Sequence, residues 1–260
     1  AFIFYILHII SCYRFIKQLF IFVATKHYLP TRKSMLTNDS FVLFAVANCK
    51  TIIILLTDQL ILQLPTDFDL TGQLVWPGAL LMNDYLCKNS DTFRDYSVIE
   101  LGSGVGISGL LCSRFCRQVI LTDHNDEVLK ILCKNIELHS SSDTLYNCCE
   151  VAAEKLEWGN ADQMKQILHK YSHGFDVILG ADICFQQSSI QPLFDTVYHL
   201  LYVKGGGCKF ILAYVSRAKT MDELVVKEAR KRGLSIQEVK GTRTHIGALE
   251  GLIFHISLQD

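Results

Sequence analysis

The sequence has little proline, almost no net charge and no cysteine pair of the C-x-x-C type. It contains 4 prolines and 16 glycines in 260 residues, which excludes collagen-like and low-complexity linker sequences. Lysine and arginine total 25 against 26 acidic residues, a net charge of −1, so the chain lacks the basic excess typical of a nucleic-acid-binding protein. The 10 cysteines include no pair with the spacing of a zinc ribbon or a redox motif. We therefore expect no metal site and no nucleic-acid partner.

Hydrophobic residues make up 50% of the chain and charged residues 20%, which is typical of a globular protein. No stretch rich in proline, glycine or serine divides residues 70–260, and the sequence has no internal repeat. We expect one domain over residues 28–260, with a β-rich extension at 28–70 and a catalytic core at 71–260. The scattered cysteines favour a reducing compartment. We expect the protein in the cytoplasm, with the nucleus as a second location, and we expect it to be a monomer.

The first 27 residues form an apolar segment of uncertain origin. Residues 1–24 are mainly apolar but are interrupted by Arg14 and Lys17, and the longest uncharged stretch is shorter than the roughly 18 residues of a confident membrane span. The segment also lacks the basic start of a signal peptide. Three interpretations stay open: a membrane anchor, an additional buried helix, or sequence foreign to the natural protein. We favour the third, because nothing downstream is typical of a secreted protein.

Within the extension, two apolar runs at residues 51–56 and 59–64 predict strands. Asp58 separates them, so we expect a β-hairpin, and Pro65 ends this stretch. Pro77 then stands where a proline opens a helix, and the apolar pattern predicts that this helix continues to about Lys88.

From residue 97 onward, strands and helices alternate. We predict strands at 97–101, 118–122, 145–153, 175–180, 207–214, 235–239 and 252–258. We predict helices at 106–116, 125–139, 161–171, 188–203 and 221–232. Such alternation indicates an α/β fold. The expected architecture is Rossmann-like, with a seven-stranded, mostly parallel sheet, helices on both faces, and an N-terminal β-hairpin extension.

A glycine-rich turn follows the first of these strands, in the run Val98-Ile-Glu-Leu-Gly-Ser-Gly-Val-Gly-Ile-Ser-Gly109. Glycines let the backbone approach a ligand closely and adopt positive φ. In open α/β sheets, ligands bind at the carboxyl ends of the strands. The alternative is a tight turn without a ligand. Asp123 favours the ligand, because an acid at the end of the next strand can accept hydrogen bonds from ribose hydroxyls. Asp123 could equally cap the helix that starts near Asn125.

The glycine spacing distinguishes two classes of nucleotide-like ligand. A dinucleotide fingerprint requires a third glycine three residues after the second, but Ile107 occupies that position after Gly104. This argues against a nicotinamide oxidoreductase. The form E-x-G-x-G-x-G, which begins at Glu100, instead resembles motif I of the seven-β-strand methyltransferases, which use S-adenosylmethionine.

Three further motifs narrow the resemblance. Trp76-Pro77 precedes the glycine loop, Trp158-Gly159 follows it, and Asp182-Ile-Cys-Phe185 comes after a further strand. In this order the motifs resemble those of the methyltransferase-like protein-lysine methyltransferases, which lack a SET domain. The resemblance covers roughly residues 28–260, and the combination is specific although each motif alone is not.

The resemblance implies a role for each motif residue. The glycine loop would hold the methionine part of S-adenosylmethionine, Asp123 its ribose and Trp158 its adenine, while Trp76 would line the same pocket. Ala181 would lie beside Asp182 and Phe185, near the transferred methyl group. The expected cofactor-binding residues are Trp76, Glu100, Gly102, Ser103, Gly104, Gly106, Asp123, Trp158 and Ala181, and the expected catalytic residues are Asp182 and Phe185. The alternative for the two tryptophans and Phe185 is ordinary packing.

For the mechanism, a lysine ammonium must lose a proton before it can accept a methyl group. Our hypothesis is that Asp182 receives and orients the lysine head, and that Phe185 packs on its side chain and favours the neutral amine, because burial lowers the pKa of lysine. The expected partner is a protein substrate; membrane association is expected only if residues 1–24 are an anchor. Two alternatives remain: a methyltransferase for another acceptor, such as protein arginine, protein histidine or a small molecule, or a non-catalytic interaction protein with this fold.

Overall fold

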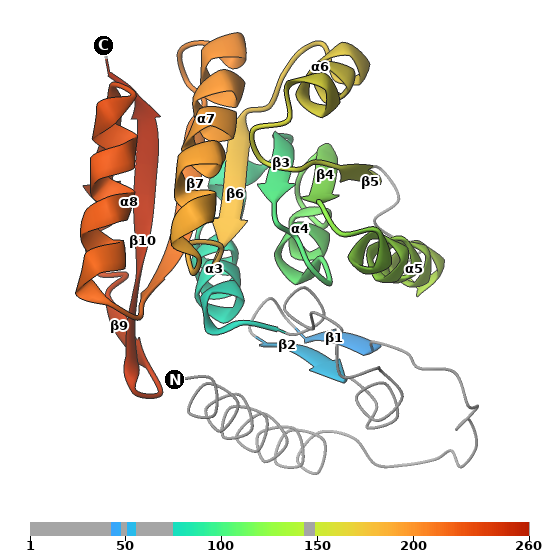
Figure 1. Cartoon of the computed structure of the whole chain (residues 1–260). Helices are drawn as coiled ribbons and strands as arrows, with labels where there is room; N and C mark the ends of the chain where they lie inside the picture. The colour runs from blue at the N-terminus through green and yellow to red at the C-terminus, as the bar shows by residue number, and fades with distance from the viewer. Residues whose placement is uncertain (1–42, 48–50, 56–74, 143–148, 260) are drawn as a thin grey trace. The chain divides into compact units, whose positions relative to one another are not determined.

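A computed structural model of the chain describes residues 43–47, 51–55, 75–142 and 149–259 (Figure 1). Two strands near the N-terminus, β1 (Leu43–Ala47) and β2 (Thr51–Leu55), form a two-stranded sheet of their own. All other described elements belong to one compact unit that includes residues 65–260.

In the described residues of this unit, a single sheet runs in the order β5-β4-β3-β6-β7-β10-β8, and a short β9 pairs with β10. These strands are β3 (Ser97–Leu101), β4 (Gln118–Asp123), β5 (Glu150–Lys155), β6 (Val177–Ala181), β7 (Lys209–Ser216), β8 (Leu234–Glu238), β9 (Thr244–Ile246) and β10 (Leu249–Leu258). The five strands from β5 to β7 in this order are parallel, whereas β10 runs antiparallel to β7, β8 and β9. The expected α/β, mostly parallel architecture is therefore confirmed, although the sheet has eight strands in the described residues where we expected seven.

The strand order of the sheet reverses beside β3. The chain passes from β3 outward to β4 and β5, then returns to the other side of β3 with β6 and β7. The carboxyl ends of β3, β4 and β6 thus meet where the strand order reverses, which is where open α/β sheets bind ligands. Four of these five parallel strands are almost wholly buried, because helices cover both faces.

The helices divide between the two faces of the sheet. They are α3 (Pro77–Lys88), α4 (Ile107–Cys112), α5 (Asp126–Ser142), α6 (Ala161–Lys170), α7 (Gln187–Lys204) and α8 (Lys219–Lys231), with a 3₁₀ turn at Ser90–Phe93. On one face, α6, α7 and α8 share a single apolar cluster that includes Met164, Leu193 and Val225. On the other face, α3 packs against α4, and α4 and α5 pack on β4.

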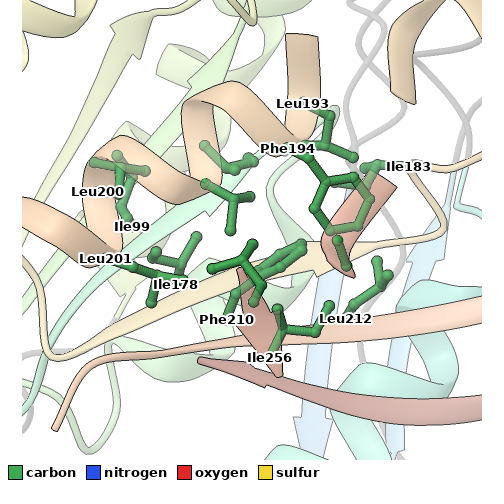
Figure 2. Close-up of a cluster of buried hydrophobic side chains, with 14 of the residues drawn as sticks. Ile99, Ile178, Ile183, Leu193, Phe194, Leu200, Leu201, Phe210, Leu212 and Ile256 are labelled. Atoms are coloured by element: carbon green, nitrogen blue, oxygen red, sulfur yellow. The ribbon is translucent and has the colours of Figure 1, made fainter. Parts of the chain in front are cut away.

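A cluster of buried apolar side chains lies between α7 and the central strands (Figure 2). Ile178 of β6, Phe210 of β7 and Ile256 of β10 are all fully buried there, together with Phe194 of α7. Phe210 packs against β6 at Gly180, where an added Cβ would lie 2.9 Å from the Phe210 ring. The core therefore fixes the position of β6 beneath the ligand-binding edge.

Most predicted elements are present within a few residues of their expected ends. Strand β5 begins later than predicted, at Glu150, and residues 145–148 of the prediction lie outside the described residues. The strand at 51–56 is present as β2, but its partner is β1; the predicted strand at 59–64 and the apolar segment at 1–24 lie outside the described residues. No helix in the described part of the chain is long and apolar enough to cross a membrane. The predicted domain limits stay predictions.

Candidate functional site

A cavity of about 410 Å³ opens at the carboxyl edge of β3, β4 and β6, and we call it the edge cavity. This volume lies within the range of small-molecule sites. Ten of the eleven residues selected from the sequence line it: Trp76, Glu100, Gly102, Ser103, Gly104, Asp123, Trp158, Ala181, Asp182 and Phe185. Residues from five separate stretches of sequence thus converge on one space.

The glycine loop between β3 and α4 adopts a backbone that only glycine tolerates well. Gly102, Gly104 and Gly106 have φ of 62°, 54° and 86°, in the left-handed region. A Cβ on Gly102 would lie 3.0 Å from Ile183 Cγ2 and 3.1 Å from Trp158 Cζ2, both in residues that line the cavity. Gly102 is therefore needed both for its φ and for the space it leaves.

Gly106 has a different role from the one that the resemblance implies. It is absent from the cavity lining. A Cβ at this position would collide with Leu132 of α5, and its φ opens α4. Gly106 therefore lets the loop pack against α5, and its effect on the edge cavity is indirect.

Hydrogen bonds between β3 and β4 hold the loop in place. The Ser103 N–H donates to the Thr122 carbonyl at 2.8 Å, and the Thr122 N–H donates to Ser103 Oγ at 3.0 Å. The hydroxyls of both residues donate to the Glu100 carbonyl. Ser103 lines the cavity as predicted. Its hydroxyl already forms hydrogen bonds to the backbone of Glu100 and Thr122, so Ser103 shapes the site chiefly through its backbone.

Glu100 is a buried acid at the wall of the cavity. It is 2% exposed, and its Oε2 accepts a hydrogen bond from the Gly109 N–H at 3.1 Å. Burial raises the pKa of its carboxyl to about 7; hydrogen bonds from the loop oppose this increase, and the charge of Asp123 adds to it. Nearby, the fully buried Ser108 hydroxyl has no hydrogen-bond partner in the described residues. Both groups are positioned to meet a polar or positively charged ligand.

Asp123 lies at the end of β4 and is 6% exposed. Its Oδ2 accepts a hydrogen bond from the Gly104 N–H at 3.2 Å, and its Oδ1 accepts one from the Asn125 N–H at 3.0 Å. Helix α5 is capped by Asn125 instead, whose Oδ1 accepts from the Glu127 N–H at 2.9 Å. The carboxylate of Asp123 thus links the glycine loop to the cavity, and the capping role weighed from the sequence belongs to its neighbour.

Trp158 lies beside Gly102 in the cavity wall and is held by the turn that follows it. Gly159 has φ of 85°, and its N–H donates to Thr196 Oγ1 at 2.9 Å. Pro192 of α7 packs against this glycine, since a Cβ there would lie 3.1 Å from Pro192 Cβ. Trp158 is partly buried and contacts the apolar cluster. Helix α7 therefore fixes the tryptophan of the Trp-Gly motif.

Asp182 lies in the cavity wall, but its carboxylate is already bound. Its side chain is 1% exposed and pairs with Arg217 at 2.5 Å and 2.9 Å, one bond to each oxygen. The Gly78 N–H of α3 donates to Oδ2 at 3.0 Å. This arrangement argues against our hypothesis that Asp182 receives the lysine head. Its backbone is in the left-handed region at φ 59°, which fits a residue held by its surroundings.

Phe185 and Trp76 form an aromatic pair at the same end of the cavity. Their rings are parallel within 2°, with centroids 6.0 Å apart, as in an offset stack. Phe185 is 41% exposed, so one face of the pair is available to a molecule that enters from solvent. The guanidinium of Arg217 lies 5.6 Å from the Trp76 ring centroid.

The family follows from a comparison with known proteins. Residues 57–230, which include the glycine loop, Asp123, Trp158 and Asp182, match the model of a family described as lysine methyltransferase. The chain belongs to the lysine methyltransferase family. The expected resemblance is thereby confirmed, and the match covers most of the compact unit that holds the cavity.

Individual lysine methyltransferases match at moderate identity. The protein-lysine N-methyltransferase EFM3 of Chaetomium thermophilum is 30% identical over 169 residues, which are 64% of this chain and 49% of that protein. The protein N-lysine methyltransferase METTL21A of Xenopus tropicalis is 32% identical over 126 residues, which are 48% of this chain and 54% of that protein. The chain spans about half the length of these relatives.

Solved structures share the fold. A putative transferase from Pyrococcus horikoshii aligns with a TM-score of 0.52 at 13% sequence identity, covering 86% of this chain and 75% of that chain. At this identity the likeness supports the Rossmann-like fold alone.

Among the residues that were not selected from the sequence, Ser108 lines the cavity, and Gly78 and Arg217 bind the Asp182 carboxylate. Arg217 follows β7 directly, and the rule that ligand sites gather at the carboxyl ends of parallel strands could have indicated it. Gly78 and Ser108 carry no comparable signal, because their importance depends on contacts that form only in the fold.

Proposed function

We propose that the chain transfers a methyl group from S-adenosylmethionine to the ε-amine of a lysine in a protein substrate. The observation that carries this proposal is the convergence of the family motifs on one edge cavity, which is lined by Asp123, Glu100 and the glycine loop and also by the aromatic pair Trp76–Phe185. The two halves of the cavity correspond to a donor side and an acceptor side.

The donor side fits S-adenosylmethionine chemically. Gly102 leaves space beside Trp158 that a Cβ would fill, so the backbone can approach a ligand closely. Asp123 presents a buried carboxylate that can accept hydrogen bonds from ribose hydroxyls. Trp158 provides an aromatic surface for the adenine. Glu100 and the unpartnered Ser108 hydroxyl offer polar contacts to the charged amino-acid part.

The chain contributes alignment and exclusion of water to the reaction. When bound, the donor supplies a methyl group on a positively charged sulfur; the neutral lysine amine bonds to that carbon, the carbon–sulfur electron pair returns to sulfur, and the surplus N–H proton leaves to solvent. Phe185 offers an exposed ring against which the apolar stem of a lysine can pack. Burial of the lysine head favours its neutral form.

Incubation with labelled S-adenosylmethionine and an undermethylated protein extract, followed by hydrolysis and amino-acid analysis, tests this proposal. We expect the label in methyl-lysine. Label in methyl-arginine or methyl-histidine would show that the acceptor is one of these residues and that the donor is still S-adenosylmethionine. No label in protein, with the donor bound, would overturn the proposal in favour of a small-molecule acceptor or a non-catalytic role.

The raised pKa of Glu100 predicts that donor binding depends on pH. Below pH 7 its carboxyl is largely protonated, and above pH 7 it is ionised. The ionised form attracts the cationic donor, so we expect the affinity for S-adenosylmethionine to be about tenfold weaker at pH 6 than at pH 8. Calorimetric titration at the two pH values measures this difference.

Glu100→Gln is the control for this prediction, because it keeps a side-chain oxygen for the Gly109 N–H but cannot ionise. The titration of the donor's own groups is common to both proteins, so the difference between them isolates Glu100. We expect weaker binding by the variant at pH 8 and a smaller pH dependence. Equal pH dependence in the two proteins would show that Glu100 does not control donor binding.

A further inference from the structure

Arg217 contacts both Asp182 and Trp76, two residues of the acceptor side that are far apart in sequence. Its Nη1 and Nη2 bind the two carboxylate oxygens of Asp182, at 2.5 Å and 2.9 Å, and Nη1 also lies 3.3 Å from the Val215 carbonyl. This two-pronged geometry matches a guanidinium to a carboxylate and holds both groups in one orientation. The pair is well shielded, because the side chain of Arg217 is 21% exposed and that of Asp182 is 1% exposed.

The same guanidinium also contacts the aromatic pair. Its Cζ lies 5.6 Å from the Trp76 ring centroid, and Trp76 stacks on Phe185. Such a distance is within the range of a cation–π interaction. Helix α3 completes the arrangement, since a Cβ on Gly78 would lie 2.6 Å from Asp182 Cβ and 2.9 Å from its backbone nitrogen. The start of α3 and the ends of β6 and β7 are thus held together at Asp182.

We propose that Arg217 is a positioning residue for the methyl acceptor. By keeping the Asp182 carboxylate paired, Arg217 leaves the incoming lysine without an anion that would stabilise its ammonium form. This inference rests on the proposed function. A free carboxylate within about 4–6 Å of a lysine raises its pKa by roughly 1–3 units. At a given pH more of the lysine would then be protonated, and the fraction of neutral, reactive amine would fall.

The other ionisable groups around the pair have partners or lie farther along the cavity. Asp222 of α8 accepts hydrogen bonds from the Tyr214 hydroxyl at 2.6 Å and from Ser216 Oγ at 2.9 Å. Burial raises the pKa of the Cys184 thiol well above its usual range, so it stays neutral. On the donor side, the ionisable groups that line the cavity are Glu100, Asp123, His124 and Glu157. Asp182 and Arg217 are thus the two charges that line or contact the acceptor side in the described residues.

Three variants test the proposal through opposite shifts of one pH profile. Arg217→Gln leaves an unpaired carboxylate, and we expect the midpoint of methyl-lysine formation against pH to rise by about one unit or more. Asp182→Asn removes the carboxylate charge that Arg217 binds and keeps the guanidinium charge, and we expect the midpoint to fall. The double variant, Arg217→Gln with Asp182→Asn, removes both charges, and we expect its midpoint to return to that of the wild type. The acceptor is the protein extract in which the wild-type chain forms methyl-lysine.

A merely structural role for Arg217 would lower the rate without these opposite shifts, and that result would overturn the proposal. Thermal unfolding of each variant identifies loss of the fold. If Arg217→Gln does not fold, Asp182→Asn and the double variant still decide between the outcomes, since one midpoint should fall and the other should match the wild type. Affinity for S-adenosylmethionine, measured in parallel, separates a loss of donor binding from a shift of the pH profile. Absence of methyl-lysine with the wild-type protein would instead contradict the proposed function.

Discussion

Gly102→Ala should weaken the binding of S-adenosylmethionine about tenfold or more. A Cβ at this position would lie 3.0 Å from Ile183 Cγ2 and 3.1 Å from Trp158 Cζ2. Both neighbours line the edge cavity, so they would have to move into the space that we assign to the donor. Overpacking of this kind costs about 1–3 kcal/mol, which is sufficient for the expected loss. Calorimetric titration of the purified variant measures it.

Gly233→Ala is the matched control. Gly233 has φ of 68°, close to the 62° of Gly102, but no atom lies within 4 Å of the position that a Cβ would take there. Both variants therefore carry the same backbone strain of about 1–2 kcal/mol, and only Gly102→Ala changes the cavity. We expect a fall in Tm for both proteins, larger for Gly102→Ala because of its added close contacts, and a loss of donor affinity for Gly102→Ala alone. Unchanged donor affinity in Gly102→Ala would place the donor elsewhere.

Phe210→Ala should cause the largest loss of stability, about 3–5 kcal/mol. The ring is fully buried in the cluster that includes side chains of β6, α7 and β10, so its removal leaves a cavity in the core (Figure 2). For a chain of this size, that loss lowers Tm by about 10 °C. Because Phe210 packs beside Gly180 of β6, we also expect some loss of methyl transfer well below the new Tm. Thermal and urea unfolding measure the change in free energy.

Phe185→Ala removes the same ring from an exposed position. Phe185 is 41% exposed, so we expect a loss of stability below about 1 kcal/mol. The same variant should impair methyl transfer more than Phe210→Ala does when both are assayed well below their Tm, because its ring forms the acceptor wall. The reverse order, with Phe185→Ala the less stable protein, would contradict the core described here.

Local patterns were sufficient to predict most of the sheet and the position of the site. The run Val98–Leu101 is apolar except for Glu100, is followed by glycines and precedes an apolar helix, and each of these features depends only on nearby residues. The convergence of Asp123, Trp158 and Asp182 followed from the topology of a parallel sheet together with the family resemblance. These predictions succeeded because strand ends gather at one edge whatever the side chains between them.

Features that depend on distant contacts could not be predicted in the same way. The pairing of Asp182 with Arg217 joins residues separated by 35 positions, and nothing in either stretch distinguishes a bound carboxylate from a free one. Gly106 belongs to the motif by spacing, but its packing against Leu132 depends on where α5 lies. The short strand β9 was also missed, although the turn of Gly247 and Ala248 between β9 and β10 is a recognised hairpin signal.

The most direct test of the central claim compares label transfer into two forms of one protein extract. In one form, guanidination converts the lysine ε-amines to homoarginine and leaves α-amines, arginine and histidine unchanged; the other form is untreated. With wild-type protein and labelled S-adenosylmethionine, we expect strong labelling of the untreated extract and background labelling of the guanidinated one. Equal labelling of both forms would show that the acceptor is not a lysine ε-amine, and would contradict the function proposed for the edge cavity.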